Sequence, residues 1–347
     1  MTHDILVRTD GPVGHISLNR PAAIHALNHD MCQAMIDALL VWRDDPAIAA
    51  VMIDHSEGRG FCAGGDIRML AESGAKDGAQ ARAFFFTEYR LNHLLFEYPK
   101  PVAVFIDGIT MGGGVGIALP AKYRIATENT RFAMPETGIG LFPDVGGGWY
   151  LSRLEGRMGQ YLALTGARLD GAECLSLGLA THYLPHEKLE EAKDRIAKHP
   201  DRIAGILGEL SLTPPHPRIM DHIDKINRHF AGDIYEEILA SLESDEGEWA
   251  AATRDTLGTK SPQTCKVALR QLAEGAAMPN FAAEMKQEYA IGARVVAMHD
   301  FIEGVRALII DKDNAPVWNP ATPDDMSDAA LAAIFAPLPK KQEWTPL

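Results

Sequence analysis

Short apolar runs alternate with helical repeats in the first part of the chain. Runs typical of strands occur at 5–8, 15–18, 50–53, 102–106 and 123–126. Between them, apolar residues recur three and four positions apart over 28–42 and 81–98, as on one face of a helix. Asn28 precedes the first of these helices and can cap it. The alternation predicts an α/β fold with parallel strand pairing.

The pattern after residue 151 is mostly helical. Helical repeats occur at 155–165, 171–177, 189–198, 218–230, 234–242, 264–274, 280–298 and 301–310. The stretch 199–217 ends in a proline-rich, irregular run, and five prolines lie between Ala315 and Pro339. We therefore predict an α/β core over 1–200, a helical region packed over it at 201–320, and a wrapping or loosely ordered tail at 321–347.

Composition narrows the class of protein. The 347 residues are 46% hydrophobic and 23% charged, as in a well-packed globular chain. A net charge of −14 argues against nucleic acid or an anionic membrane as partner, and an anionic ligand would need a local basic patch. The four cysteines are scattered and no metal-binding motif is present, so we expect reduced thiols and no metal. Without a signal sequence or a long apolar run, a cytoplasmic location is predicted.

The stretch RFAMPETGIGLFPDVGGGWY at 131–150 places two carboxylates, Glu136 and Asp144, among apolar residues and glycines. Apolar surroundings would strip water from a carboxylate and raise its pKa toward the range useful for acid–base catalysis. Alternatively, both residues could simply begin helices, where the helix dipole favours a negative charge. The stretch alone leaves both interpretations open.

Two glycine turns join a predicted strand to a following segment, at Ala63-Gly64-Gly65 and at Gly112-Gly113-Gly114. Glycine permits close approach by a ligand, and a helix start leaves backbone N–H groups unpaired. Two such N–H groups could together bind a thioester or ester carbonyl oxygen. Neither turn fits a phosphate-binding loop or a dinucleotide fingerprint, so a nucleotide cofactor has little support.

These motifs resemble the crotonase (enoyl-CoA hydratase/isomerase) superfamily. The resemblance is carried by FCAGGDI at 61–67, IDGITMGGG at 106–114 and MPET at 134–137, and it extends over about 5–320. A closer similarity, to the branch of 3-hydroxyisobutyryl-CoA hydrolases, lies in segments 108–116, 133–151, 163–166, 261–272 and 299–318. The resemblance implies the ClpP/crotonase fold, a spiral of repeated ββα units, with a helical C-terminal region. It also implies that the charged segment 299–313 covers the active-site face as a structural element.

The resemblance also implies roles for individual residues. The N–H groups of Gly65 and Gly113 would form the oxyanion hole, Glu136 would be the acid–base carboxylate, and Asp144 would hold the substrate's 3-hydroxyl. Glu88 matches a substrate-contacting position, although the residues alone favour a solvent-exposed helix face for it. Contacts to coenzyme A are implied for Ala23, Ile24, Ala63, Gly64, Ile67 and Arg68.

Two departures from the family pattern matter. Hydratases of this fold carry a second glutamate where this chain has Gly116, and many relatives carry a lysine where it has Ala22. Gly116 favours a hydrolase over a hydratase. Because coenzyme A is polyanionic and the chain is acidic, local cations must meet the phosphates. The candidates are Arg59, Arg68, Lys266 and Arg270, the last two being one helical turn apart. For any single one of them ordinary surface charge is the favoured alternative, and segment 58–68 as a whole is the better candidate.

The expected activity is therefore hydrolysis of 3-hydroxyisobutyryl-CoA in valine breakdown, with 3-hydroxypropionyl-CoA as a second substrate. Glu136 would either activate a water or attack the carbonyl to form a mixed anhydride, and the sequence leaves both routes open. A hydratase or isomerase is the first alternative, and a non-catalytic binding protein of the same fold is the second. No cofactor is expected, because coenzyme A is part of the substrate. A homo-oligomer, a trimer or hexamer as in relatives, is an open expectation.

Overall fold

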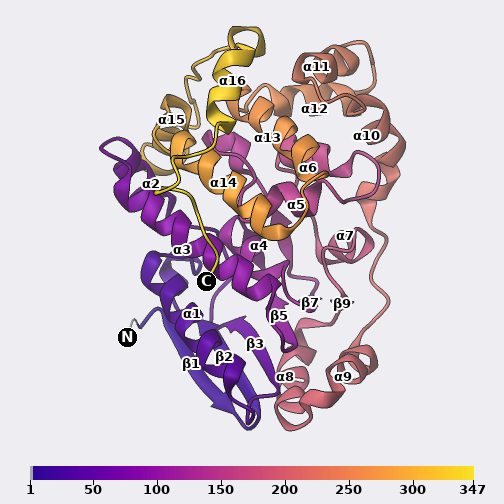
Figure 1. The fold of residues 1–347 in the computed structure, drawn as a ribbon. Coiled ribbons are helices and arrows are strands. Elements are labelled where there is room, and N and C mark those ends of the chain that lie inside the picture. Colours follow the sequence, from indigo (N-terminus) through magenta and orange to yellow (C-terminus); the bar gives the residue numbers. More distant parts are fainter. Residues whose placement is uncertain (1–2) are drawn as a thin grey trace.

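The strands form two sheets in the computed structural model, which describes residues 3–347 (Figure 1). The larger sheet has the order β1-β2-β3-β5-β7-β9. Its strands are β1 (Ile5–Asp10), β2 (Val13–Leu18), β3 (Ala50–His55), β5 (Val102–Ile106), β7 (Tyr123–Ala126) and β9 (His182–Tyr183). Only the β1–β2 hairpin is antiparallel, and every later pair in this sheet is parallel. The predicted α/β fold with parallel pairing is therefore confirmed.

The smaller sheet consists of β4 (Gly60–Cys62), β6 (Ile109–Met111) and β8 (Arg131–Ala133), all parallel. Each of these strands directly follows a strand of the larger sheet, so the chain visits both sheets before it continues into the next segment. Three such passes make the predicted spiral of ββα units. The sequence did not reveal β4, β6 and β8, because three residues are too few to show a period of two.

Helices cover both faces of the larger sheet. α1 (His29–Asp44) and α3 (Ala79–Phe96) pack against each other on one face, and Asn28 caps α1 by accepting a hydrogen bond from the Met31 N–H. On the other face, α8 (Leu189–Lys198) and α9 (Ile203–Leu210) bury their apolar side chains against Met52 and Phe105. α9 lies in the segment that we predicted to be irregular toward its end. α2 (Ile67–Gly74) follows the first glycine turn, where the sequence pattern predicted no helix.

Most of the remaining helices lie in the upper part of the molecule, at the opposite end from α8 and α9, and some short ones lie at mid-height (Figure 1). They are α4 (Gly113–Ala118), α5 (Gly147–Leu151), α6 (Met158–Thr165), α7 (Gly171–Ser176), α10 (Ile223–His229), α11 (Tyr235–Glu243), α12 (Glu248–Leu257), α13 (Pro262–Gly275), α14 (Phe281–Val295) and α15 (His299–Val305). α14 packs on α3, and α13 packs on α5 and α6. The sequence pattern missed α12.

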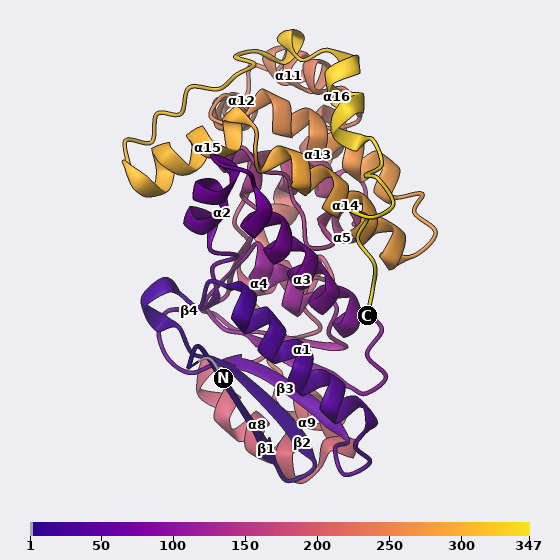
Figure 2. The ribbon, with the colours of Figure 1, turned by 60° about the vertical axis from the view of Figure 1, so that its left-hand side comes forward.

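The tail is ordered and wraps the molecule. α16 (Asp328–Phe335) packs on α14, and the chain then runs alongside α3 (Figure 2). Trp344 is 2% exposed, and its indole N–H donates to the carbonyl of Phe86 at 3.2 Å. Arg90 donates to the carbonyl of Thr345 at 2.9 Å. The wrapping alternative is thus confirmed, and the loosely ordered alternative is wrong, because Trp344 supplies a buried anchor.

All four cysteines are buried and free, as the scattered positions predict. Across residues 3–347, none of the helices combines the length and the apolar character that a membrane crossing requires.

Candidate active site

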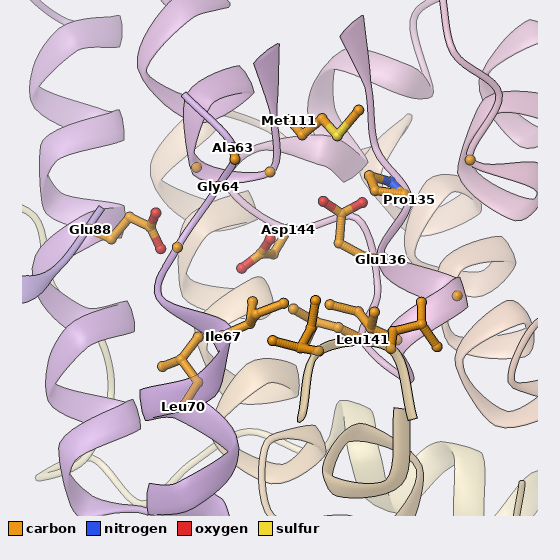
Figure 3. Close-up of a pocket in the computed structure, with 18 of the residues that line it drawn as sticks. Ala63, Gly64, Ile67, Leu70, Glu88, Met111, Pro135, Glu136, Leu141 and Asp144 are labelled. Carbon is orange, nitrogen blue, oxygen red and sulfur yellow. The ribbon is translucent and has the colours of Figure 1, made fainter. Parts of the chain in front are cut away.

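The three strands of the smaller sheet end at one edge, because they run parallel. β4 leads into Ala63-Gly64-Gly65, β6 leads into Gly112-Gly113, and β8 leads through Met134-Pro135 to Glu136. These three loops surround a cavity of about 470 Å³ (Figure 3). Eight residues singled out from the sequence line it: Ala63, Gly64, Gly65, Ile67, Glu88, Gly113, Glu136 and Asp144.

The two glycine turns lie against each other. A Cβ atom built on Gly64 would be 3.7 Å from the Gly113 nitrogen, and both Gly64 and Gly112 have a positive φ, at 111° and 48°. Gly113 is the first residue of α4, where no intrahelical acceptor exists. Within residues 3–347 the N–H groups of Gly65 and Gly113 donate to no protein group. Two unpaired donors therefore stand at the wall of the cavity.

Glu136 lies beside these turns. It begins the 3-10 helix Glu136–Ile139, is 4% exposed, and its Oε2 atom has no hydrogen-bond partner. A Cβ atom on Gly112 would be 3.3 Å from Glu136 Oε1. Burial raises the pKa of Glu136 well above its usual range, and the nearby Asp144 raises it further. Glu136 does start a helix, as the alternative interpretation holds, but its side chain points into the cavity.

Asp144 is also 4% exposed, and the Tyr89 hydroxyl donates a hydrogen bond to its Oδ2 atom at 2.7 Å. Burial raises the pKa of Asp144 to about 6, while the Tyr89 hydrogen bond opposes the rise. The loop that carries Asp144 is fastened to α14, because Glu288 accepts hydrogen bonds from the Gly146 and Gly148 N–H groups at 2.8 and 3.1 Å. The orientation of Asp144 is thus set by two helices, α3 and α14.

Glu88 projects from α3 into the same cavity (Figure 3). It is 2% exposed, so the solvent-exposed position favoured by the residues alone is wrong. Its Oε1 atom has no partner, and burial together with Asp144 raises the pKa of Glu88 well above its usual range. A side chain on Gly113 would clash with Glu88 Oε1. The wrong prediction arose because a charged residue on a helix is usually exposed, whereas α3 is buried on several faces.

Much of the remaining cavity wall is apolar and includes Ile67, Leu70, Phe84, Phe85, Ile139, Leu141, Leu308 and Ile309. Leu308 and Ile309 come from a π-helical turn at Arg306–Ile310 that follows α15. Arg306 holds this turn by hydrogen bonds to Glu303, Asp311 and Asp313. The charged segment 299–313 is therefore structural and covers the site, as expected.

Other predicted contacts lie outside the cavity wall. Ala23 and Ile24 are half-buried beside the first glycine turn, where the Ile24 carbonyl accepts from the Ala63 N–H at 2.9 Å. Arg68 and Arg59 are exposed. Their contacts to coenzyme A remain predictions.

Lys266 and Arg270 are wrong candidates. Lys266 pairs with Glu236 and donates to the Pro323 carbonyl, and Arg270 pairs with Glu274 while its guanidinium lies over the Phe335 ring. Their helix face is occupied by the tail. The sequence analysis missed Tyr89, Arg168 and Lys260, because no motif near them in sequence points to the site. Of these three residues, Arg168 and Lys260 line the cavity.

Comparison with known proteins assigns the chain to a family. A profile described as enoyl-CoA hydratase/isomerase matches residues 13–335. The chain belongs to this family. Two relatives named 3-hydroxyisobutyryl-CoA hydrolase, mitochondrial, are 41% identical (Gallus gallus) and 39% identical (Homo sapiens), each over 344 residues. Each alignment covers 96% of this chain and 89% of the relative.

Solved structures agree on the crotonase fold. A structure named carnitinyl-CoA dehydratase from Mycobacterium thermoresistibile superposes with a TM-score of 0.94 at 38% identity. One named enoyl-CoA hydratase from Rhodobacter sphaeroides 2.4.1 superposes with a TM-score of 0.88 at 37% identity. Both alignments cover 99% of each chain. The resemblance read from the motifs is confirmed.

Proposed function

We propose that this chain hydrolyses the thioester of 3-hydroxyisobutyryl-CoA to 3-hydroxyisobutyrate and coenzyme A, the reaction of valine breakdown expected from the motifs. The observation that carries the proposal is one cavity holding the Glu136 carboxyl with its unpartnered Oε2 atom, the two free N–H groups of Gly65 and Gly113, and Asp144 fixed by Tyr89. The similarity to relatives named for this reaction over nearly the whole chain supports it.

The first step is polarisation of the thioester. The carbonyl oxygen accepts hydrogen bonds from Gly65 and Gly113, and these bonds strengthen as negative charge develops on that oxygen. The ionised Glu136 carboxylate is the acid–base group. Because burial raises the pKa of Glu136, its carboxylate is a stronger base than an exposed glutamate.

Two routes lead from there to products. In one, Glu136 takes a proton from water, the hydroxide adds to the carbonyl carbon, the C–S bond breaks, and the thiolate receives the proton. In the other, a Glu136 oxygen adds to the carbon, the thiolate leaves, and water cleaves the resulting anhydride. A single turnover in ¹⁸O-labelled water separates them, because only the anhydride route, with water adding at the Glu136 carbonyl, puts label into Glu136.

Asp144 supplies selectivity for a 3-hydroxyl. Its Oδ2 atom is engaged by Tyr89, which leaves the other oxygen to accept a hydrogen bond from the substrate's hydroxyl. A site that hydrogen-bonds a substrate hydroxyl strongly disfavours a substrate that lacks this hydroxyl. A missing methyl group, by contrast, changes transition-state binding by only about 1–3 kcal/mol. 3-Hydroxypropionyl-CoA, which lacks one methyl, is therefore the second substrate.

A hydratase is the alternative, favoured by the names of the two solved structures. Against it stands position 116, where hydratases place their second glutamate. A Cβ atom on Gly116 would lie 2.5 Å from Val145 Cβ and 2.8 Å from Asn92 Nδ2, so no side chain fits there. The site therefore has no room for that second carboxylate.

The deciding experiment compares thiol release from (S)-3-hydroxyisobutyryl-CoA with hydration of crotonyl-CoA, using the same enzyme preparation. Rapid thiol release with little hydration is the expected result. Hydration without thiol release would overturn the proposal in favour of a hydratase. Activity on neither would overturn the assignment of this acyl group.

Location and assembly are also proposals. We keep the predicted cytoplasmic location, although the relatives are named as mitochondrial, and cell fractionation tests it. A trimer or hexamer is tested by light scattering.

A further inference from the structure

Two cations at the cavity have no partner. Lys260 and Arg168 both line it, and neither makes an ion pair or side-chain hydrogen bond within residues 3–347. Lys260 is half-buried, while Arg168 is exposed and so marks a solvent-facing part of the wall. Burial, and then the charge of Arg168, lowers the pKa of Lys260. An unpaired ammonium held out of water beside a second cation is unfavourable unless an anion joins them.

The local backbone adds to the positive potential. Lys260 immediately precedes Ser261, the N-cap of the 14-residue helix α13, whose amino end carries partial positive charge. The Ser261 N–H donates to the Thr137 carbonyl at 3.0 Å, which fixes Lys260 beside the loop of Glu136. A Cβ atom on Gly138 would lie 3.4 Å from Lys260 Nζ, so the bare glycine leaves the ammonium open to the cavity.

The cations are separate from the three cavity carboxyls. The charge of Asp144 raises the pKa of Glu136 and of Glu88, and neither Lys260 nor Arg168 is among the causes that shift the pKa of these three carboxyls. The cavity thus has an acidic part, where the thioester would react, and a basic part at Lys260 and Arg168. In a chain of net charge −14, such a basic part is the local patch that a polyanionic ligand requires.

We propose that Lys260 and Arg168 together bind an oxyanion of the ligand. Two sources share this chemistry: a phosphate of the coenzyme A moiety, and the carboxylate of the released acid after it has moved away from the acidic part in which the thioester reacts. The inference rests on the proposed function for both ligands, but binding can be measured without turnover. Failure of thiol release and failure of this site are therefore distinguishable.

The experiment is calorimetric titration of the full chain with free coenzyme A, with pantetheine, which lacks the phosphates, and with 3-hydroxyisobutyrate. The variants are Lys260→Gln and Arg168→Gln, with Lys260→Arg as the charge-preserving control. Arg59→Gln and Arg68→Gln test the two exposed arginines of the first loop. Thermal unfolding of each variant verifies that it is folded.

If a phosphate is the ligand, both Gln variants bind coenzyme A about tenfold more weakly, as loss of a charged hydrogen bond predicts, and bind pantetheine unchanged. If the carboxylate is the ligand, binding of 3-hydroxyisobutyrate weakens about tenfold instead. Lys260→Arg retains most of the affinity in either case, and added salt weakens binding more in the wild type than in the Gln variants. Unchanged affinities for all three ligands, or equal losses for coenzyme A and pantetheine, would overturn the proposal. So would a phosphate-dependent loss confined to Arg59→Gln or Arg68→Gln.

Discussion

The hydroxyl of Tyr89 donates to Asp144 Oδ2 at 2.7 Å, with both residues buried. Among residues 3–347, no other side chain donates a hydrogen bond to Glu88, Glu136 or Asp144. A donor stabilises the ionised form of the carboxyl that accepts it. Tyr89 therefore favours ionisation of Asp144, to which it donates, over ionisation of Glu88, which has no such donor.

Tyr89→Phe removes that donor. We expect kcat/KM for a 3-hydroxyacyl-CoA to fall about tenfold, which corresponds to about 1.4 kcal/mol, with a smaller loss for an acyl-CoA without the hydroxyl. The pKa of Asp144, about 6 with Tyr89 in place, rises, so the acidic limb of the pH–rate profile moves to higher pH. Tyr289→Phe, on the ring that packs edge-on against Tyr89, is the control. Equal losses for both substrates would contradict this role.

Glu136→Gln keeps the shape of the site but removes its base. Turnover should fall by roughly 10³-fold or more, while the Kd of an acyl-CoA changes little. Glu284→Gln is the matched control, because Glu284 is also buried and unpartnered but lies outside the cavity wall. Stopped-flow thiol release measures the first quantity and calorimetry the second. Normal turnover by the Gln variant would refute the role given to Glu136.

Asp144→Asn tests the cost of a buried charge. The folded-state pKa of Asp144 is raised to about 6 from 3.8, so the folded protein holds this proton more tightly than the unfolded chain. The ionised side chain therefore destabilises the fold as pH rises from about 4 to 6, by about 1–3 kcal/mol at the plateau. The variant should melt at a higher temperature than wild type at pH 8 and nearly equally at pH 4. A pH-independent difference would contradict the argument.

Gly116→Ala tests whether position 116 tolerates a side chain. The new Cβ would collide with Val145, whose own Cβ cannot swing away, so we expect a loss of about 1–3 kcal/mol. Gly208→Ala is the control, because no atom lies within 4 Å of its Cβ position and α9 is exposed there. That change should stabilise by about 0.5–1 kcal/mol. We expect the melting temperature to fall for Gly116→Ala and to rise for Gly208→Ala, relative to the wild type.

Trp344→Ala removes the anchor of the tail. We expect about 3–5 kcal/mol of destabilisation, as for other buried aromatic residues. Activity of the protein that remains folded should also fall, because the contacts to Phe86 and Arg90 flank the turn that carries Glu88. Leu347→Ala, at a 55% exposed residue, should change neither quantity. Full activity of folded Trp344→Ala would show that the tail stabilises without positioning Glu88.

The sequence predicted the helices and strands that are long enough to show a repeat of apolar residues. α1 was found to within two residues at each end, because its helical repeat is long and Asn28 marks its start. β4, β6 and β8 were not found, although their loops carry the site, because each has three residues.

The site was predictable where a motif is continuous in sequence, as around Glu136 and both glycine turns. It was not predictable where folding joins distant segments. Tyr89 lies 55 positions before Asp144, and Lys260 follows Arg168 after 92 positions. The error over Lys266 and Arg270 has the same origin, because the tail that occupies their face lies far along the chain.

Short strands open easily, since few hydrogen bonds hold them. The small sheet is built of such strands, and all three of its loops border one cavity. A ligand that contacts all three loops would therefore hold them together and raise the free energy needed to open the sheet locally. Hydrogen exchange at the amides of β4, β6 and β8 should slow together on binding, so that exchange reports occupancy of the cavity independently of any chemistry within it.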